Sequence, residues 1–453
     1  MGYFYRKKRI IIRNVGEFFR ILSDAVDRAR KSGYNKYNTI CPMKGYPSAM
    51  NNYSTIFTPA DMLLPHDPAR FAVIACDQFT SAPEYWDACR TCIGSAPSAL
   101  DYILPEAYLG TPAEAAQKEW IREHMRDFTP DAMVAYSGLV YVERILPDGS
   151  IRYGVVGKLD LEAYDYAKDS RSPIRATEET VLERIPPRCK IREEAAIELP
   201  HILILVDEEP LFAYLSVMRP LLDTLYDCDL MEGGGHIRGY AVTGEVLVWV
   251  MDRIAAYETA HKDGVVYAMG DGNHSLAAAK AHYENLKKAL GDAAKEHPAR
   301  YALCEITGLS EPSLVFEPIY RVLTGCDPAD VLDALGKITA LGYGGETIHV
   351  LCGDRVETVH FTAPTHALTV GSLQDFLDGY RKTHPETNCD YIHGEDALRS
   401  LAKEAHTVGF LFDGMAKEEL FPYVAAHGTL PRKTFSMGEA KSKRYYLEAR
   451  VIR

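Results

Sequence analysis

The residues best suited to chemistry are Asp271 and His274, which stand where an apolar run gives way to a helix-forming run. The stretch from Gly264 to Met269 is typical of a β-strand, and it ends abruptly in the sequence Gly-Asp-Gly-Asn-His-Ser. A strand that breaks at glycines and feeds a helix directs free backbone N–H groups at one point, which suits an anion. A carboxylate and an imidazole there add proton transfer or metal binding. We therefore expect the active site at this turn.

The segment after this turn has the period of an amphipathic helix. Its apolar side chains fall on one stripe, made up of Leu276, Ala279, Tyr283, Leu286 and Leu290. A simple turn with Asn273 as the helix cap is the structural alternative, because Asn fills that role routinely. Gly270 and Gly272 do not complete a dinucleotide fingerprint, since the third position is Ser275. The chain also lacks a Gly-Lys-Ser/Thr phosphate loop, so a nucleotide would bind by another fold.

A second candidate segment, residues 174–188, places three arginines and three glutamates within fifteen residues. Charges spaced in this way are also typical of a solvated helix face with i,i+4 pairs. In a functional interpretation, Glu178 accepts a substrate proton while Arg175 and its neighbours hold phosphate. Pro186-Pro187 is expected to stop any helix, which would leave Arg188 on a loop that reaches a pocket.

A third segment is basic although the protein is acidic. Residues 430–444 contain Arg432, Lys433 and Thr434, followed by Lys441, Lys443 and Arg444. This composition fits a solvent-exposed run of charge that has no functional role. It also fits a phosphate clamp that closes over the site. Cys89 and Cys92 form a single Cys-x-x-Cys pair, which is weak support for zinc or redox chemistry.

Bulk properties narrow the class of protein. The chain has 453 residues, 47% of them hydrophobic, which suffices for two or three domains with real cores. Its net charge of −13 argues against a general nucleic-acid binder. Ten scattered cysteines fit reduced thiols, and no apolar run approaches the roughly 20 residues of a membrane span. We expect a soluble cytoplasmic protein without a membrane partner.

The pattern of segments predicts an α+β fold with a mixed sheet in two packed lobes. Residues 1–52 form a basic extension, because 11 Lys/Arg and 3 Asp/Glu fall within the first 50 residues. Residues 53–317 should form an N-terminal lobe that holds the Asp-Gly-Asn-His turn, with a hairpin at 139–159 and a buried strand at 201–206. Residues 318–453, in shorter units, should form a C-terminal α/β lobe that closes over the site.

These motifs together resemble an uncharacterised conserved bacterial and archaeal family, the domain-of-unknown-function family numbered ten-fifteen. Residues 269–275 are similar to its Asp-Gly-His-His-Arg motif, although Asn273 replaces the first His and Ser275 replaces the Arg. Further matching segments, in the same order, are Ala75–Thr80, Ile174–Glu178, Phe412–Met415 and Pro431–Phe435. The resemblance covers about residues 58–450.

That family in turn resembles the ParB/sulfiredoxin superfamily, in which a strand–Asp/Gly–His–helix turn holds nucleotide phosphates. One branch of it phosphorylates free serine. The resemblance implies a ParB/sulfiredoxin-like core with Asp271 and His274 at the phosphates and Glu178 as base on the acceptor hydroxyl. Losing the motif's Arg at Ser275 removes a phosphate contact, which Arg175, Arg432 or Lys433 would have to supply.

The leading hypothesis is an ATP-dependent (or other nucleotide-dependent) kinase of a small hydroxylated metabolite such as free L-serine. Catalysis would involve Glu178, Asp271 and His274, with Mg²⁺ held by Asp271 through water. The expected phosphate-binding residues are Gly270, Gly272, Asn273, Ser275, Arg175, Arg432, Lys433 and Thr434. One alternative is a ParB-like nucleotide switch without kinase activity. Another is a sulfiredoxin-like or hydrolytic enzyme, which would need a reactive thiol such as that of Cys304.

Overall fold

A computed structural model describes residues 54–180 and 182–453 of the chain. Tyr53–Arg453 forms one compact unit, and the helices and strands named below all belong to it. The basic extension expected over residues 1–52 lies outside the described residues. In the described part of the chain, no helix is both long and apolar enough to cross a membrane.

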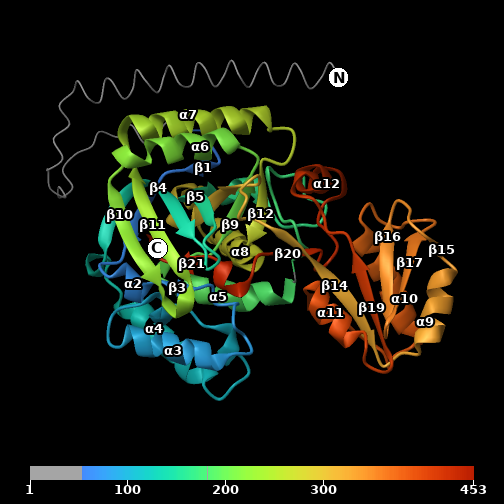
Figure 1. Cartoon of the computed structure of the whole chain (residues 1–453). Helices are drawn as coiled ribbons and strands as arrows, with labels where there is room; N and C mark the ends of the chain where they lie inside the picture. The colour runs from blue at the N-terminus through green and yellow to red at the C-terminus, as the bar shows by residue number, and fades with distance from the viewer. Residues whose placement is uncertain (1–53, 181) are drawn as a thin grey trace. The chain divides into compact units, whose positions relative to one another are not determined.

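The larger sheet has 11 strands in the order β10-β11-β4-β5-β13-β9-β12-β7-β6, with β1 added to β5 and β2 to β4 (Figure 1). It is mixed: β13 and β9 run parallel, as do β12 and β7, whereas β12 and β9 are antiparallel. The strands are β1 (Phe57–Thr58), β2 (Ala60–Leu64), β4 (Val134–Ile145), β5 (Ile151–Asp160), β6 (Tyr164–Asp165), β7 (Ile174–Arg175), β9 (Leu203–Val206), β10 (Thr224–Leu230), β11 (Gly235–Val242), β12 (Tyr267–Asp271) and β13 (Tyr301–Gly308).

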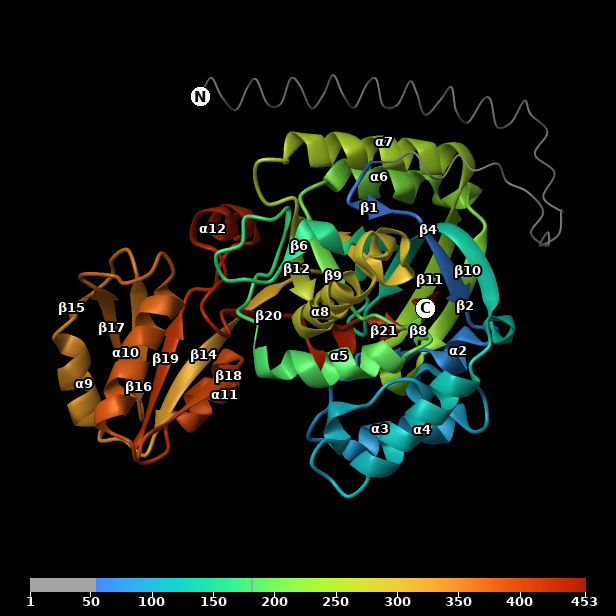
Figure 2. The ribbon, with the colours of Figure 1, turned by 180° about the vertical axis from the view of Figure 1, so that it is seen from behind.

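Alternation along these strands gives the sheet two buried faces. Tyr141 and Val155 join the apolar cluster under α6, α7 and α8, whereas Val140 and Val156 join the cluster that contains α3. Figure 2 shows α5 and α8 side by side, and the two helices pack together. The helices of this region are α2 (Pro68–Phe71), α3 (Pro83–Ile93), α4 (Glu114–Asp127), α5 (Ile185–Glu194), α6 (Glu209–Met218), α7 (Gly244–Ala260) and α8 (Asn273–Leu290).

The smaller sheet has seven strands, all paired antiparallel, in the order β15-β17-β16-β19-β14-β18 with β20 added to β14. Helices α9 and α10 cover one face, and α11 lies on the other. The elements are β14 (Phe316–Thr324), α9 (Pro328–Gly336), β15 (Thr339–Leu341), β16 (Thr347–Cys352), β17 (Arg355–Phe361), α10 (Thr369–Thr383), β18 (Asn388–His393), α11 (Glu395–Leu401), β19 (Thr407–Phe412), α12 (Leu420–His427) and β20 (Phe435–Met437).

The last residues leave the smaller sheet and form two separate two-stranded pairs with segments that precede residue 200. β21 (Tyr445–Tyr446) pairs with β3 (Val73–Ile74), and β22 (Arg450–Val451) pairs with β8 (Ile197–Glu198). The side chains of Tyr445, Tyr446 and Leu447 are buried in the same cluster as α3. The smaller sheet begins with β14 at Phe316, and residues 445–451 pair outside it.

The mixed α and β architecture with a large mixed sheet is confirmed. The hairpin predicted over 139–159 forms as β4 and β5, and the apolar run at 201–206 contains β9. Helix α7 begins at Gly244, directly after β11. Its preceding residue, Thr243, is extended, and the Val-Leu-Val-Trp-Val run after Gly244 is helical because its apolar side chains pack on α6 and the sheet.

Candidate functional site

The turn between β12 and α8 has the geometry that the sequence indicates. Pairing with β9 shifts register between Met269 and Asp271, which is a bulge centred on Gly270. Gly272 then adopts φ +80°, a left-handed conformation that glycine accepts without strain, and it is the N-cap of α8. No side chain caps this helix, so the structural alternative with Asn273 as cap is wrong; Asn273 is the first helical residue.

A cavity of about 970 Å³ opens at this turn. That volume is at the upper end of the usual range for small-molecule sites, which is roughly 300–1,000 Å³. The turn contributes six consecutive lining residues, Gly270, Asp271, Gly272, Asn273, His274 and Ser275. Other walls come from the loop after β3, from residues 177–178, from β14 and from residues 433–443. Segments that lie far apart in the sequence therefore meet in one cavity.

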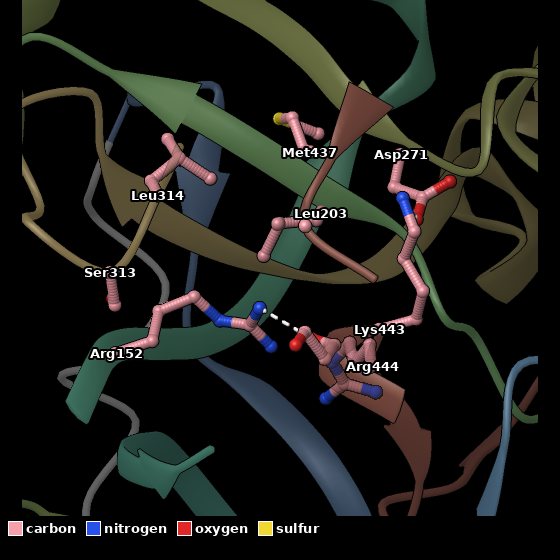
Figure 3. Close-up of a pocket in the computed structure, with 10 residues that line it drawn as sticks. Arg152, Leu203, Asp271, Ser313, Leu314, Met437, Lys443 and Arg444 are labelled. Atoms are coloured by element: carbon pink, nitrogen blue, oxygen red, sulfur yellow. Dashed lines mark hydrogen bonds and ion pairs between the residues drawn. The ribbon is translucent and has the colours of Figure 1, made fainter. Parts of the chain in front are cut away.

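Asp271 is held by two contacts. Its Oδ1 accepts a hydrogen bond of 2.8 Å from the backbone N–H of Gly272, and its Oδ2 lies 3.4 Å from Nζ of Lys443. Figure 3 shows the Lys443 side chain extending toward this carboxylate from the C-terminal segment. Both side chains are partly exposed, at 16% for Lys443 and 21% for Asp271, so a ligand can reach them. The corner thus combines an anion, a cation and a helix N-terminus.

Buried arginines hold the backbone just before Lys443. Arg152 donates a 2.8 Å hydrogen bond to the carbonyl of Ser442, drawn as a dashed line in Figure 3, and Arg144 donates to the carbonyl of Lys441 at 3.2 Å. Arg444 is itself buried and forms ion pairs with two buried glutamates, Glu305 at 2.8 Å and Glu448 at 2.7 Å. A small cavity of about 10 Å³, lined by Arg152, Asp271 and Lys443 among others, lies in this network. Lys443 is therefore presented from a rigid support.

Glu178 approaches the same corner from another segment. The backbone of Glu178 forms an isolated parallel β-bridge with Leu430. The neighbouring Thr177 donates a 2.7 Å hydrogen bond to the carbonyl of Met269. Burial raises the pKa of Glu178, the charge of Asp271 raises it further, and Lys433 and Lys443 oppose the shift. A carboxylate with a raised pKa is suited to accept a proton near neutral pH.

Lys433 lines the cavity with an unusual backbone. Its φ is +54°, a conformation that side chains other than glycine adopt at a cost. Arg321, a fully buried residue, donates to the carbonyl of Lys433 at 3.1 Å and to that of Arg432 at 2.8 Å, and so holds the turn in place. Strained residues held in this way occur often at ligand sites.

The structure does not bring all the expected residues to the cavity. Arg175 is buried on β7, and its guanidinium donates to the backbone carbonyls of Ser172 and Val424 at 3.0 and 3.4 Å. Arg432 forms an ion pair of 2.6 Å with Asp378 of α10. Thr434 is buried and its hydroxyl donates to the carbonyl of Pro431. These three residues are absent from the cavity wall, whereas the other predicted site residues line it.

A second group of polar residues lines the cavity, and the sequence interpretation missed all of it except Arg188, which was expected to reach a pocket. The group consists of Cys76, Asp77, Gln78, Glu106, Arg188 and His201. Asp77 had a usable signal, because its segment is one of those that match the family motifs. Arg188 does reach the cavity, but not from a loop: Pro186 and Pro187 lie in the first turn of α5, where proline is tolerated, and do not end a helix.

The described residues contain no group of three or more His, Cys, Asp or Glu side chains arranged for a metal ion. This arrangement still fits Mg²⁺ in a nucleotide enzyme, which usually relies on one or two carboxylates together with substrate phosphates and water. Asp271 and Glu178 are the carboxylates at the corner, since the charge of Asp271 acts on the pKa of Glu178. Of the two, Asp271 would hold the ion, since the raised pKa of Glu178 suits that residue to accept a proton.

Comparison with known proteins shows the family. Residues 57–447 match the family described as "Protein of unknown function (DUF1015)", and the chain belongs to it. The resemblance read from the motifs is thereby confirmed. No match was found among curated proteins.

Several solved structures are similar over part of the chain. A conserved hypothetical protein from Pyrococcus furiosus is 12% identical, with 64% of this chain and 90% of that chain covered and a TM-score of 0.31. A free serine kinase mutant in complex with AMP is 14% identical, with 64% and 95% covered and a TM-score of 0.34. SbnI with a C-terminal truncation, from Staphylococcus aureus, is 10% identical, with 64% and 85% covered and a TM-score of 0.34. At these values the assignment of the site rests on its own geometry.

Proposed function

We propose that this protein is a nucleotide-dependent phosphotransferase that acts on a small hydroxylated metabolite, with ATP as donor and free L-serine as the first acceptor to test. The observation that carries the proposal is the joining, in one cavity, of an uncapped helix N-terminus, two lysines and a glutamate with a raised pKa. Phosphoryl transfer needs these elements more than it needs covalent chemistry, because positioning and charge stabilisation supply most of the catalysis.

The nucleotide phosphates would lie at the first turn of α8. Backbone N–H groups of a helix N-terminus favour phosphate, and Gly272 keeps the turn free of a side chain at that point. Lys433 and Lys443 supply positive charge in an otherwise acidic protein. Lys443 would supply the positively charged phosphate contact that the family motif's Arg provides where this chain has Ser275. We assign the expected ParB/sulfiredoxin-like core to this corner, which is built from β9, β12 and α8.

Glu178 would act as the base. It accepts the proton of the acceptor hydroxyl as that oxygen forms a bond to the γ-phosphorus. The bond between this phosphorus and the β,γ-bridging oxygen breaks, and the nucleoside diphosphate leaves with the negative charge. Mg²⁺, held by Asp271 through water, would neutralise charge on the phosphates when bound. His274 would donate a hydrogen bond to a phosphate oxygen.

The smaller sheet contributes Glu317, Tyr320 and His393 to the cavity wall. The first two residues belong to β14, which follows β13 of the larger sheet along the chain, and His393 belongs to β18, which pairs with β14. We assign to this region, which begins at about residue 318, the closing of the site over the nucleotide.

The direct test is incubation of the purified protein with Mg-ATP and a panel of amino acids, with phosphoserine followed by mass spectrometry. Phosphorylated product that disappears in Asp271→Asn is the expected result. Failure to bind nucleotide in calorimetry, together with no product, would refute the proposal. Binding or hydrolysis of a nucleotide without transfer to any acceptor would instead indicate a ParB-like switch.

A further inference from the structure

The second polar group of the cavity lies beside the first and comes from parts of the chain far from it. β3 pairs antiparallel with β21, so the loop that follows β3 lies at the same end as the residues that precede β21. The loop carries Asp77, and the residues before β21 include Lys443. The backbone N–H of Ala75 also donates to the carbonyl of Arg444 at 3.0 Å. The fold thus places Asp77 next to the lysine that pairs with Asp271.

His201 enters the group from the strand beside Asp271. Leu203 of β9 is the partner of Asp271 in the sheet, and His201 stands two residues before it. The residue is 5% exposed, and its Nδ1 lies 2.7 Å from the hydroxyl of Tyr446 on β21. A buried imidazole in a fixed hydrogen bond gives this side of the cavity a rigid floor.

Two charges of opposite sign complete the group. Burial tends to raise the pKa of Asp77, but His201, the amide of Gln78 and Lys443 outweigh it and lower the pKa, so this carboxylate is charged near neutral pH. Arg188 forms an ion pair with Glu106, and because both residues line the cavity, a permanent positive charge is present in its wall. Both Asp77 and Arg188 act on the pKa of the Cys76 thiol, which places them around one point.

We propose that this group, Asp77, Arg188 and His201, is the acceptor subsite and recognises a zwitterionic α-amino acid that carries a hydroxyl group. The ammonium group lies against Asp77, the carboxylate against Arg188, and the side-chain hydroxyl points toward Glu178 and the phosphates. A small zwitterion presents a charge complementary to each of these two side chains, whereas a neutral sugar or polyol does not. This inference rests on the proposed function for the role of the hydroxyl, but binding itself does not.

The test measures binding separately from turnover. L-Serine, D-glycerate (which lacks the ammonium group) and ethanolamine (which lacks the carboxylate) are titrated calorimetrically into the full chain saturated with Mg-ADP. We expect L-serine to bind at least tenfold more tightly than either analogue. Asp77→Asn should weaken L-serine binding at least tenfold and leave D-glycerate within twofold. Arg188→Gln should likewise weaken L-serine binding at least tenfold, and it should leave ethanolamine binding within twofold. It therefore provides an independent variant.

Two controls keep the result interpretable. Asp131→Asn removes an exposed carboxylate outside the cavity and should change no binding constant. Unaltered ADP affinity in the subsite variants shows that the protein is folded. Equal L-serine affinity in Asp77→Asn and the native protein would overturn the subsite, and so would the absence of binding by all three probes. Tight L-serine binding without phosphorylation would overturn the proposed function and leave the subsite intact.

Discussion

Nζ of Lys443 lies 3.4 Å from Oδ2 of Asp271, and this ion pair joins the C-terminal segment to the strand-to-helix turn. The pair is only partly exposed, so a phosphate that enters the cavity can exchange with the carboxylate as partner of the lysine. Lys443 also acts on the pKa values of Asp77 and Glu178. It is the one cation that links the turn, the base and the second polar group among the described residues.

Replacement of this lysine should weaken nucleotide binding. Lys443→Met removes a charged hydrogen-bond donor worth about 1.5–3 kcal/mol, which corresponds to roughly a 10- to 150-fold loss of ATP affinity. Calorimetry with Mg-ATP analogues measures the loss. The matched control is Lys441→Met, because Nζ of Lys441 lies near Gly233 and this residue does not line the cavity. Equal losses in both variants would contradict the assignment.

Variants of the turn should separate folding from function. Asp271→Asn and His274→Ala remove side chains that line the cavity and lie outside the buried stripe of α8. We expect thermal unfolding within a few degrees of the native protein and a loss of at least about 100-fold in kcat/KM, the usual cost of one interaction made in the transition state. ATP binding and turnover at native levels in both variants would exclude the turn as the site.

Glu178 should impose an acid limb on the rate. Because its pKa is raised, the base is lost as pH falls through a value above the usual glutamate range, and log kcat/KM should fall with it. Glu178→Gln should lower kcat by about 10²- to 10⁴-fold. ATP affinity in this variant reports whether the phosphate site remains intact.

Glu178 should affect the stability of the fold in the opposite direction: low pH removes the base but favours the folded state. The pKa of Glu178 is higher in the folded state than in the unfolded state. As pH rises from the unfolded-state pKa to the folded-state pKa, the unfolded state releases its proton first, and the free energy of unfolding therefore falls. Glu178→Gln removes that cost. The variant should therefore be more stable than the native protein at pH 8 and equally stable near pH 4, as measured by urea denaturation. A stability difference that is independent of pH would show that the carboxylate is not strained by burial.

Variants of Lys433 should separate the effect of its backbone conformation from the effect of its charge. Lys433→Gly should stabilise the protein by roughly 1 kcal/mol, because glycine accepts φ +54° without strain. It should also weaken ATP binding through the loss of the ammonium group. Lys433→Met is the matched control, since it removes the charge and keeps the strain. Denaturation midpoints and calorimetry distinguish the two effects, and a Gly variant less stable than the Met variant would contradict the account.

The buried ion network under Lys443 should matter for folding. Arg444→Ala leaves Glu305 and Glu448 buried without their cation, which typically costs about 3–5 kcal/mol. Arg126→Ala, which removes an exposed partner of Asp127, should change stability by less than about 0.5 kcal/mol. Chemical denaturation compares the two. A small effect in Arg444→Ala would show that water replaces the lost partner.

The turn at Asp271 could be predicted because its signals are local. An apolar run, glycines that break it and an amphipathic stripe lie within about 30 residues, and the same holds for the hairpin of β4 and β5. The remainder of the cavity depends on pairings across the chain, such as β3 with β21, which no local pattern reveals. Asp77 and His201 therefore stayed unassigned.

The charge of a side chain did not predict its contacts where backbone geometry determines them. Arg175 has the composition of a phosphate ligand, yet the surrounding carbonyl groups occupy its guanidinium. The Pro186-Pro187 pair is compatible with the end of a helix or with its first turn, and only packing of α5 on α8 selects the second. Such choices lie beyond the information in a short window of sequence.

The pairing of β21 with β3 bears on how the protein is made. A nascent chain that has emerged only as far as α12 already contains the Asp271 turn, but Lys443 and the strand that holds it are still missing. Affinity for nucleotide should thus arise late in biosynthesis, when the final segment folds back onto β3. Ribosome-bound chains of increasing length should acquire ATP affinity only once residue 446 has cleared the exit tunnel.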